Sequence, residues 1–323
     1  MDYEYYNNYS YIYNDIINSS PRRILPSKAS YIIVLIIYFI TFSIGISFNT
    51  AVIWLTGFKW PRSITTYLFL NLAVSNFLLV VCVPLEIIYI LMDFHWPFGH
   101  FVCKTSSFIF HTGAYSSIFI LMIISVDRYC SSFHIELCYV YRFQRIVSII
   151  ICIMWIISMT LSFPHYYFKT IQKMGDTVDC FDDFHKDRDI SISIRNTLSS
   201  ISFIAGYAIP GNIFIFCYYN LAVNNRRLSK GHFYTILLLM SAFFICWTPY
   251  NALKLSEIIN SFYYYNADII DINIISTSIV FLNSCINPII YVFLSKFLQF
   301  NRVSIEDSLK LILSEETDNS NSV

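Results

Sequence analysis

Seven long apolar segments dominate this sequence and leave few folds open to it. They cover residues 31–55, 65–92, 102–126, 146–168, 192–219, 233–259 and 269–294. Crossing a bilayer as a helix takes about 20 mostly apolar residues, and backbone groups cannot stay unpaired in lipid, so such runs form helices rather than open strands. Because the connections are short, we expect an all-α membrane protein: one seven-transmembrane helix bundle without a second folded domain.

The charges are few and unevenly placed. Charged residues make up 13% of the chain, about half of the share in a typical soluble domain. Apart from the adjacent Asp127 and Arg128 at the end of the third segment, the loops after the first, third and fifth segments carry cations opposed only by Glu136. These cations are Lys59, Arg62, Arg142, Arg145, Arg226, Arg227 and Lys230. Basic loops stay in the cytoplasm. We therefore predict an extracellular tail at 1–27, a bundle at 28–294 and a cytoplasmic segment at 295–323.

The predicted outer tail is rich in tyrosine and asparagine and shows no cleavable signal peptide. Two sequons, at Asn8 and Asn18, fit the glycosylation pattern. Pro21 follows the second sequon and disfavours its use. A chance occurrence in an asparagine-rich tail is the alternative for both.

The predicted topology divides the nine cysteines between the outer side and the rest of the chain. Only Cys103, at the start of the third segment, and Cys180, in the loop after the fourth, fall on the outer side. Two thiols alone in an oxidising compartment are typical of a disulfide. Such a bond ties the loop across the mouth of the bundle. Buried thiols elsewhere in the spans act mostly as small apolar residues.

Several motifs lie at matching depths in separate segments. They are Asp127-Arg128-Tyr129, Trp155, Cys246-Trp247-Thr248-Pro249 and Asn287-Pro288-Ile289-Ile290-Tyr291. Together they make the chain resemble a rhodopsin-like G-protein-coupled receptor, whose third segment is joined by a disulfide to the loop after the fourth segment. The resemblance implies a plasma-membrane protein with an extracellular ligand and a heterotrimeric G protein as partners.

The resemblance also implies a switch within the bundle. Ligand pressure shifts Trp247 and Phe243, and Pro249 acts as a hinge for the sixth segment. Tyr218 and Tyr291 then approach Arg128, which Asp127 holds in the resting state. Simple helix bending at the prolines, with no moving part, is the alternative.

One motif departs from the family. Asn76 stands where the family usually has an aspartate that holds a sodium ion, with polar partners at positions matching Ser117, Asn283 and Asn287. An uncharged amide attracts a monovalent cation far less than a carboxylate does. We therefore expect weak or no control by sodium and an altered basal activity.

Within the family, the chain is most similar to chemoattractant receptors of the formyl-peptide and chemerin group. The segments that carry this resemblance are 57–59, 92–99, 246–257, 283–288 and 313–318. It implies a peptide or small-protein ligand and a G protein of the inhibitory class. Positions that carry charged groups in formyl-peptide receptors hold His111, Leu198 and Ser202 here, so that chemistry is absent.

Four ionisable side chains near the outer ends of the spans are candidates for a ligand pocket: Glu86, His111, Lys254 and Glu257. Ionisable groups at membrane depth are commonly functional. The alternative is that Glu86 is paired internally and that Lys254 and Glu257 extend to interfacial water.

The segment 295–313 has the pattern of a short amphipathic eighth helix lying on the inner leaflet. Beyond it, hydroxyls at Ser314, Thr317, Ser320 and Ser322 stand among acidic residues. Phosphorylation there makes an anionic patch that arrestin can read, and a plain tail is the alternative.

Rival classes find less support. The sequence has no internal repeat as in a transporter, no lysine within the seventh segment as in a retinal protein, and no metal cluster or nucleophile triad as in an enzyme. No cofactor, metal or nucleic acid is expected. A non-signalling decoy that captures a chemoattractant stays open because of Asn76, and a chemokine-receptor-like protein because of the acidic tyrosine-rich tail. Heavy use of Ile, Asn and Tyr favours a virus-encoded homologue.

Overall fold

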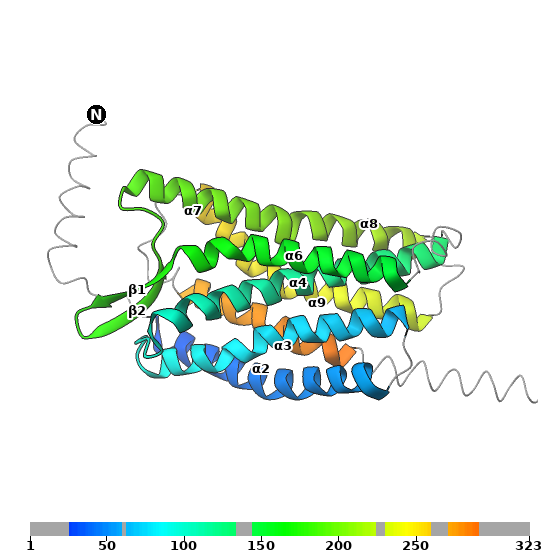
Figure 1. Ribbon diagram of the computed structural model, residues 1–323, viewed down its shortest axis with the longest axis horizontal. Coiled ribbons are helices and arrows are strands. Elements are labelled where there is room, and N and C mark those ends of the chain that lie inside the picture. Colours follow the sequence, from blue (N-terminus) through cyan, green and yellow to red (C-terminus); the bar gives the residue numbers. More distant parts are fainter. Residues whose placement is uncertain (1–25, 60–62, 134–143, 224–229, 260–270, 291–323) are drawn as a thin grey trace, which may run out of the picture.

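The helices of the computed structural model of the protein lie side by side along one axis (Figure 1). The structure describes residues 26–59, 63–133, 144–223, 230–259 and 271–290. Its elements are α2 (Lys28–Trp54), η1 (Leu55–Lys59), α3 (Ile64–Leu91), α4 (Gly99–Phe133), α6 (Gln144–Tyr167), β1 (Lys169–Met174), β2 (Thr177–Asp182), α7 (Arg188–Phe203), η2 (Ile204–Ala208), α8 (Ile209–Val223), α9 (Lys230–Ile259) and the unlabelled helix Asp271–Ile290. The predicted seven-helix bundle is confirmed.

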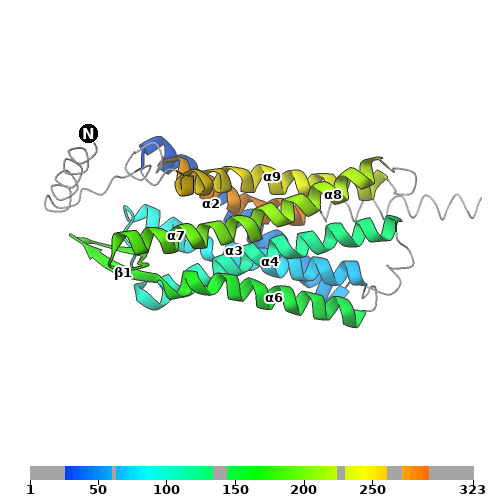
Figure 2. The same cartoon turned by 90° about the horizontal axis from the view of Figure 1, so that it is seen from above.

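Six of the described rods are long and apolar enough to cross a membrane. They are Lys28–Lys59, Ile64–Leu91, Gly99–Ser131, Arg145–Tyr167, Arg188–Val223 and Asp271–Ile290. The sixth rod in chain order, α9, is 30 residues long and packs beside α7 and α8 (Figure 2).

The fifth rod differs from its predicted limits at the outer end. It begins at Arg188 rather than at residue 192, because the Asp187 side chain caps it by accepting hydrogen bonds from the backbone N–H groups of Asp189 and Ile190. The carboxylate satisfies N–H groups that have no partner within the first helical turn. The same rod contains one wide turn, η2, between α7 and α8.

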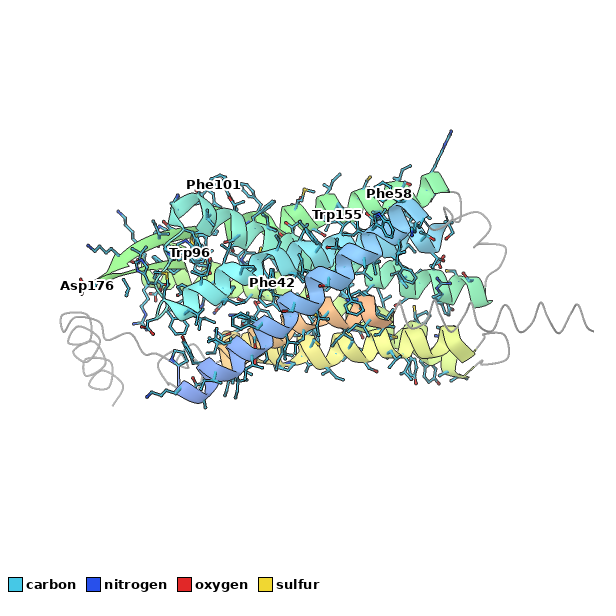
Figure 3. All side chains as sticks on the ribbon, turned by 90° about the horizontal axis from the view of Figure 1, so that it is seen from below. Phe42, Phe58, Trp96, Phe101, Trp155 and Asp176 are labelled. Atoms are coloured by element: carbon cyan, nitrogen blue, oxygen red, sulfur yellow. A yellow bond between two sulfur atoms is a disulfide. The ribbon has the colours of Figure 1, made fainter. Side chains whose placement is uncertain are left out.

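The rod α4 is the centre of the bundle. Of the residues in its most apolar stretch, 67% are buried. In the rods at Lys28–Lys59 and Arg145–Tyr167 the corresponding share is 22%. The rods at the periphery of the bundle instead project large apolar side chains away from it, among them Phe58 on η1 (Figure 3). At Gly113, α4 approaches α3 so closely that an added Cβ would lie 2.9 Å from the carbonyl oxygen of Ser75. Glycine is required here because backbone stands on the other side.

A two-stranded antiparallel hairpin, β1–β2, covers the outer end of the bundle, where the sequence predicts only a loop. Its register pairs Lys169 with Asp182 and Met174 with Thr177. Gly175 in the turn has a φ of 63°, a conformation that suits the tight turn of a hairpin.

Several predicted features fall outside the described residues. These are the sequons at Asn8 and Asn18, Tyr291, the amphipathic helix at 295–313 and the hydroxyls of the final segment. The side chain of Glu257 is also outside the described part, although its backbone belongs to α9. These features stay predictions.

Candidate functional site

A disulfide fixes the hairpin to the bundle. Cys103, fully buried at the start of α4, is bonded to Cys180 in β2, with the two Cα atoms 5.8 Å apart. These are the two cysteines that the positive-inside pattern predicts to lie on the outer side. The bond closes a loop across 77 residues of sequence and holds one strand over the bundle axis.

The loop between α3 and α4 supports the hairpin from its side. The backbone N–H of Val178 donates to His95 Nδ1 at 3.0 Å, and Val178 accepts from the backbone N–H of Trp96 at 2.8 Å. The Tyr89 hydroxyl donates to Asp179 Oδ1 at 2.6 Å. With the disulfide, these contacts make the hairpin a fixed roof.

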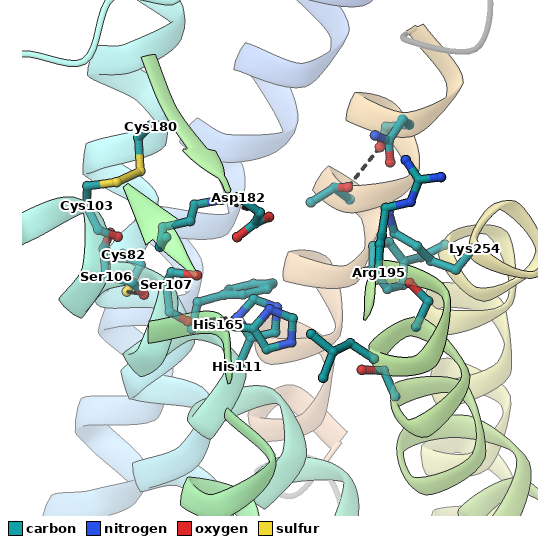
Figure 4. Close-up of a pocket in the computed structure, with 18 of the residues that line it drawn as sticks. Cys82, Cys103, Ser106, Ser107, His111, His165, Cys180, Asp182, Arg195 and Lys254 are labelled. Atoms are coloured by element: carbon teal, nitrogen blue, oxygen red, sulfur yellow. Dashed lines mark hydrogen bonds and ion pairs between the residues drawn. A yellow bond between two sulfur atoms is a disulfide. The ribbon is translucent and has the colours of Figure 1, made fainter. Parts of the chain in front are cut away.

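A cavity of about 600 Å³ lies beneath this roof (Figure 4). Side chains from the hairpin, α3, α4, α6, α7, α9 and helix 271–290 line it. Its size falls within the range of sites that bury a small ligand or a short peptide segment.

Three of the four predicted pocket residues line this cavity: Glu86, His111 and Lys254. Leu198 and Ser202, named as departures from the formyl-peptide pattern, line it too, and Ser202 accepts a hydrogen bond from the Tyr115 hydroxyl at 2.8 Å. Neither side chain brings a charge into the pocket.

Four ionisable groups line the cavity that were not among the predicted pocket residues: His165, Lys169, Asp182 and Arg195. His165 and Arg195 lie inside predicted spans, where an ionisable group is itself a signal of function. Their positions inside apolar spans could therefore have identified both as pocket candidates. Lys169 and Asp182 gave none, because only the hairpin register places them opposite each other.

Charge is divided between two sides of the cavity. Figure 4 shows Asp182 on the side of the disulfide, and Arg195 and Lys254 across the cavity from it. Lys169 Nζ lies 3.3 Å from Asp182 Oδ2, so this carboxylate has a cationic partner. A ligand that spans the cavity therefore meets groups of different charge at its two sides.

Two histidines form the floor of the cavity. The rings of His111 and His165 are stacked, with centroids 3.5 Å apart, and His111 Nδ1 lies 2.8 Å from the carbonyl oxygen of Ser107. Both rings also line a smaller cavity of about 50 Å³ that reaches Trp247. The floor thus separates the outer cavity from the predicted toggle.

The toggle residues lie in the core of α9, which continues as a helix through Pro249. Phe243 is fully buried and Trp247 is 6% exposed, and their rings are 6.3 Å apart. Phe214 of α8 contacts Phe243 edge-on at 4.9 Å. Aromatic contacts therefore connect Trp247 through Phe243 to the fifth rod.

Below Trp247 lies a cluster of uncharged polar groups. Ser117 donates to Asn76 Oδ1 at 2.9 Å, and both side chains are fully buried. The amide nitrogen of Asn76 and both polar atoms of Asn283 and Asn287 have no hydrogen-bond partner within the described residues. The polar groups described in this cluster are hydroxyls and amides, and the weak or absent control by sodium expected from Asn76 stays a prediction.

At the inner end, Arg128 is tied to two elements. Its Nη2 donates to Thr65 Oγ1 of α3 at 2.9 Å, and its Nε lies 3.9 Å from Asp127 Oδ2. The Tyr129 ring lies 5.4 Å from that of Phe216 on α8. Tyr218 is half-buried and Pro288 is buried. The contact with Thr65 was not anticipated.

Comparison with known proteins decides the family. A family model described as "7 transmembrane receptor (rhodopsin family)" matches residues 48–291, about three quarters of the chain. The protein is a rhodopsin-family receptor.

The receptor is also similar to individual proteins along most of its length. It is 46% identical to a G-protein coupled receptor homolog of fowlpox virus over 89% of this chain and 90% of that protein. It is 35% identical to human chemerin-like receptor 2 over 97% of this chain and 90% of that protein. A second fowlpox virus homolog is 31% identical over 87% of this chain and 86% of that protein.

These similarities confirm the predicted chemerin-receptor-like subgroup, and the two fowlpox virus proteins agree with the predicted virus-encoded homologue. The receptor is a multi-pass membrane protein of a family that signals and does not catalyse. An extracellular ligand and a heterotrimeric G protein are the partners that this family implies.

Proposed function

We propose that the receptor binds a peptide or small-protein chemoattractant at the cell surface and activates a heterotrimeric G protein of the inhibitory class. The roofed outer cavity carries this proposal. It has room for a peptide segment, and ionisable groups line opposite sides of it. Similarity to chemerin-like receptors supports the same ligand class.

The proposal includes an orientation. The tail 1–27 is extracellular, and the segment 295–323 is cytoplasmic, where phosphorylation of its hydroxyls would make a site for arrestin. The disulfide Cys103–Cys180 supports it because such bonds persist in an oxidising compartment. Lys59 and Arg145, from the basic loops, lie at the ends of their rods opposite to the hairpin. An epitope tag at residue 1 that antibodies reach only after permeabilisation would contradict this orientation.

Signalling then follows a chain of contacts. A ligand in the outer cavity presses on the His111–His165 floor, which borders the small cavity at Trp247. Movement of Trp247 and Phe243 shifts α9 against α8, and the inner end opens around Arg128. Physically, this is an equilibrium between two arrangements, and the ligand shifts it only by binding one of them more tightly.

A capture receptor that binds the chemoattractant without signalling is the second candidate. The uncharged cluster at Asn76 favours it, because this part of the switch differs from the family pattern. The two candidates share the outer cavity and differ at the inner end.

A G-protein activation panel distinguishes them. Cells that express the full chain receive chemerin, formyl peptides or buffer, and nucleotide exchange and ligand uptake are measured together. We expect exchange on inhibitory G proteins, and its loss without loss of ligand binding in Arg128→Ala. Uptake without exchange on any G protein would establish the capture receptor instead.

A further inference from the structure

One carboxylate joins the outer end of α2 to the outer end of helix 271–290. The backbone N–H of Ser27 donates to Asp271 Oδ1 at 2.8 Å, and the Ser30 hydroxyl is hydrogen-bonded to the same carboxylate. The two serines also contact each other, because Ser27 Oγ donates to Ser30 Oγ at 3.0 Å and accepts from the Ser30 backbone N–H at 3.2 Å. We call these three residues the Asp271 clip.

Other contacts join the same two helices deeper in the bundle. Cys285 donates to the carbonyl oxygen of Thr41 at 3.2 Å, and Asn49 donates to that of Ser284 at 2.9 Å. These bonds hold the helices together independently of the clip. Loss of the clip therefore frees the chain ahead of α2 and leaves the bundle assembled.

The clip acts on the base of the outer tail. Ser27 is the last residue before α2, and its side chain caps this helix. Because Asp271 binds the backbone of Ser27, it holds the chain at the point where the tail joins the bundle. A hydrogen bond to an ionised carboxylate is about twice as strong as one between neutral groups.

The clip also lies at the rim of the outer cavity. Asn273, Thr277 and Phe281 of the same helix line this cavity. Asp271 precedes the first of them by two residues, which is about 3 Å along a helix axis. The chain ahead of Ser27 is 26 residues long and spans up to about 90 Å when fully extended. A tail fixed at this base is therefore long enough to contact a ligand whose end occupies the cavity.

We propose that Asp271 is a positioning residue that fixes the base of the outer tail at the rim of the cavity, where tail and cavity contact one ligand together. The inference rests on the proposed function and adds a residue that acts on the ligand only through the tail. Two linked binding elements bind more tightly than either alone, because the second contact forms at a high effective concentration. Release of the tail base lowers that concentration and leaves the cavity unchanged.

Tryptic cleavage of the tail tests the clip without any ligand. Cells that display the full chain with an epitope at residue 1 are treated with trypsin, and loss of the epitope measures cleavage at Arg22, Arg23 or Lys28. Cleavage needs a mobile segment, so Asp271→Ala should lose the epitope about three- to tenfold faster than the wild type, the range for one lost hydrogen bond. Asp271→Asn keeps an acceptor oxygen and should be cleaved near the wild-type rate.

A matched control removes a carboxylate elsewhere on the outer side. Asp176 is exposed at the tip of the β1–β2 hairpin (Figure 3). Asp176→Ala lowers the charge by the same amount as Asp271→Ala and should leave the cleavage rate unchanged.

Binding of labelled chemerin at equal surface display tests the effect on the ligand. We expect Asp271→Ala to raise the concentration for half-maximal binding about three- to tenfold and Asp271→Asn to stay near the wild type. The same variants are then compared in a receptor whose residues 2–21 are replaced by glycine and serine. There Asp271→Ala should have no further effect, because the tail no longer contributes to binding.

Three results separate the proposal from its alternatives. Cleavage of Asp271→Ala at the wild-type rate would overturn the clip. A loss of affinity that persists with the substituted tail would overturn the positioning role, since it would show that Asp271 supports the bundle itself. A wild type that binds no chemerin would count against the ligand class of the proposed function, whereas the cleavage rates would still decide whether Asp271 fixes the tail.

Discussion

The imidazole ring of His111 lies flat on that of His165, 5° from parallel. The two residues come from α4 and α6, and their rings border both the outer cavity and the small cavity at Trp247. In the mechanism that we propose, a ligand acts on Trp247 by displacing this floor or pressing on it.

The floor gives the first prediction. His165→Ala removes one ring and joins the two cavities, so the agonist concentration for half-maximal binding should rise about tenfold, the upper range for a lost aromatic pair. His165→Phe keeps a flat ring and should stay within about threefold of wild type. Displacement of a labelled peptide measures both. An equal loss of agonist affinity in the two variants would show that ring stacking at residue 165 does not determine agonist binding.

The uncharged cluster at Asn76 gives the second prediction. Agonist affinity of the wild type should be the same in sodium chloride as in N-methylglucamine chloride at equal ionic strength. Asn76→Asp adds a carboxylate beside Ser117 and should make affinity depend on sodium, because a buried carboxylate needs a cation or hydrogen bonds. Asn76→Ala is the control and should stay insensitive. A sodium effect in the wild type would contradict this account.

The disulfide gives the third prediction. Cys103→Ser should lose most surface display and ligand binding, since removal of a native disulfide costs about 2–5 kcal/mol and frees the hairpin that roofs the cavity. Cys152→Ser removes a lipid-exposed thiol outside the bundle core and should be neutral. Flow cytometry with an outer epitope measures display. Normal ligand binding by Cys103→Ser would refute the role of the roof.

The close approach of α3 and α4 gives the fourth prediction. In Gly113→Ala the new Cβ would lie 2.9 Å from Ser75 O and 3.1 Å from Leu79 N, both backbone atoms that do not move cheaply. Overpacking of this kind costs about 1–3 kcal/mol, so the melting temperature of the detergent-solubilised receptor should fall. Gly57→Ala meets nothing within 4 Å and should melt as the wild type does.

The bundle was predictable because its signal is repeated along the whole chain. Each apolar run needs only length and hydrophobicity to be recognised as a span. Most of the described ends lie within four residues of the predicted ones, although α4 continues seven residues past residue 126 to Phe133. The shift at Arg188 has a local cause, the Asp187 cap. By contrast, no periodic signal distinguishes the strands β1 and β2 from an ordinary loop, because they are six residues each and mostly polar.

The pocket was predictable only in part, for a physical reason. Glu86 and Lys254 stood out as charges in apolar surroundings, and both line the cavity. The pairing of His111 with His165 depends on how α4 and α6 are rotated against each other, and a single sequence does not specify that rotation. The same holds for the hydrogen bond from Arg128 to Thr65, which joins residues 63 positions apart.

The wide turn η2, at Ile204–Ala208, has a consequence for engineering. A π-type turn accommodates one extra residue, so the half of the rod that faces the ligand is offset by about 100° from the phase of an uninterrupted α-helix. Deleting one residue there would swing Ser202 away from Tyr115 while α8 stayed in place. A homologue with an unbroken fifth helix would therefore be misaligned with this chain by one residue on the ligand side of the turn. Site residues carried over from it position by position would be assigned to the wrong neighbour there.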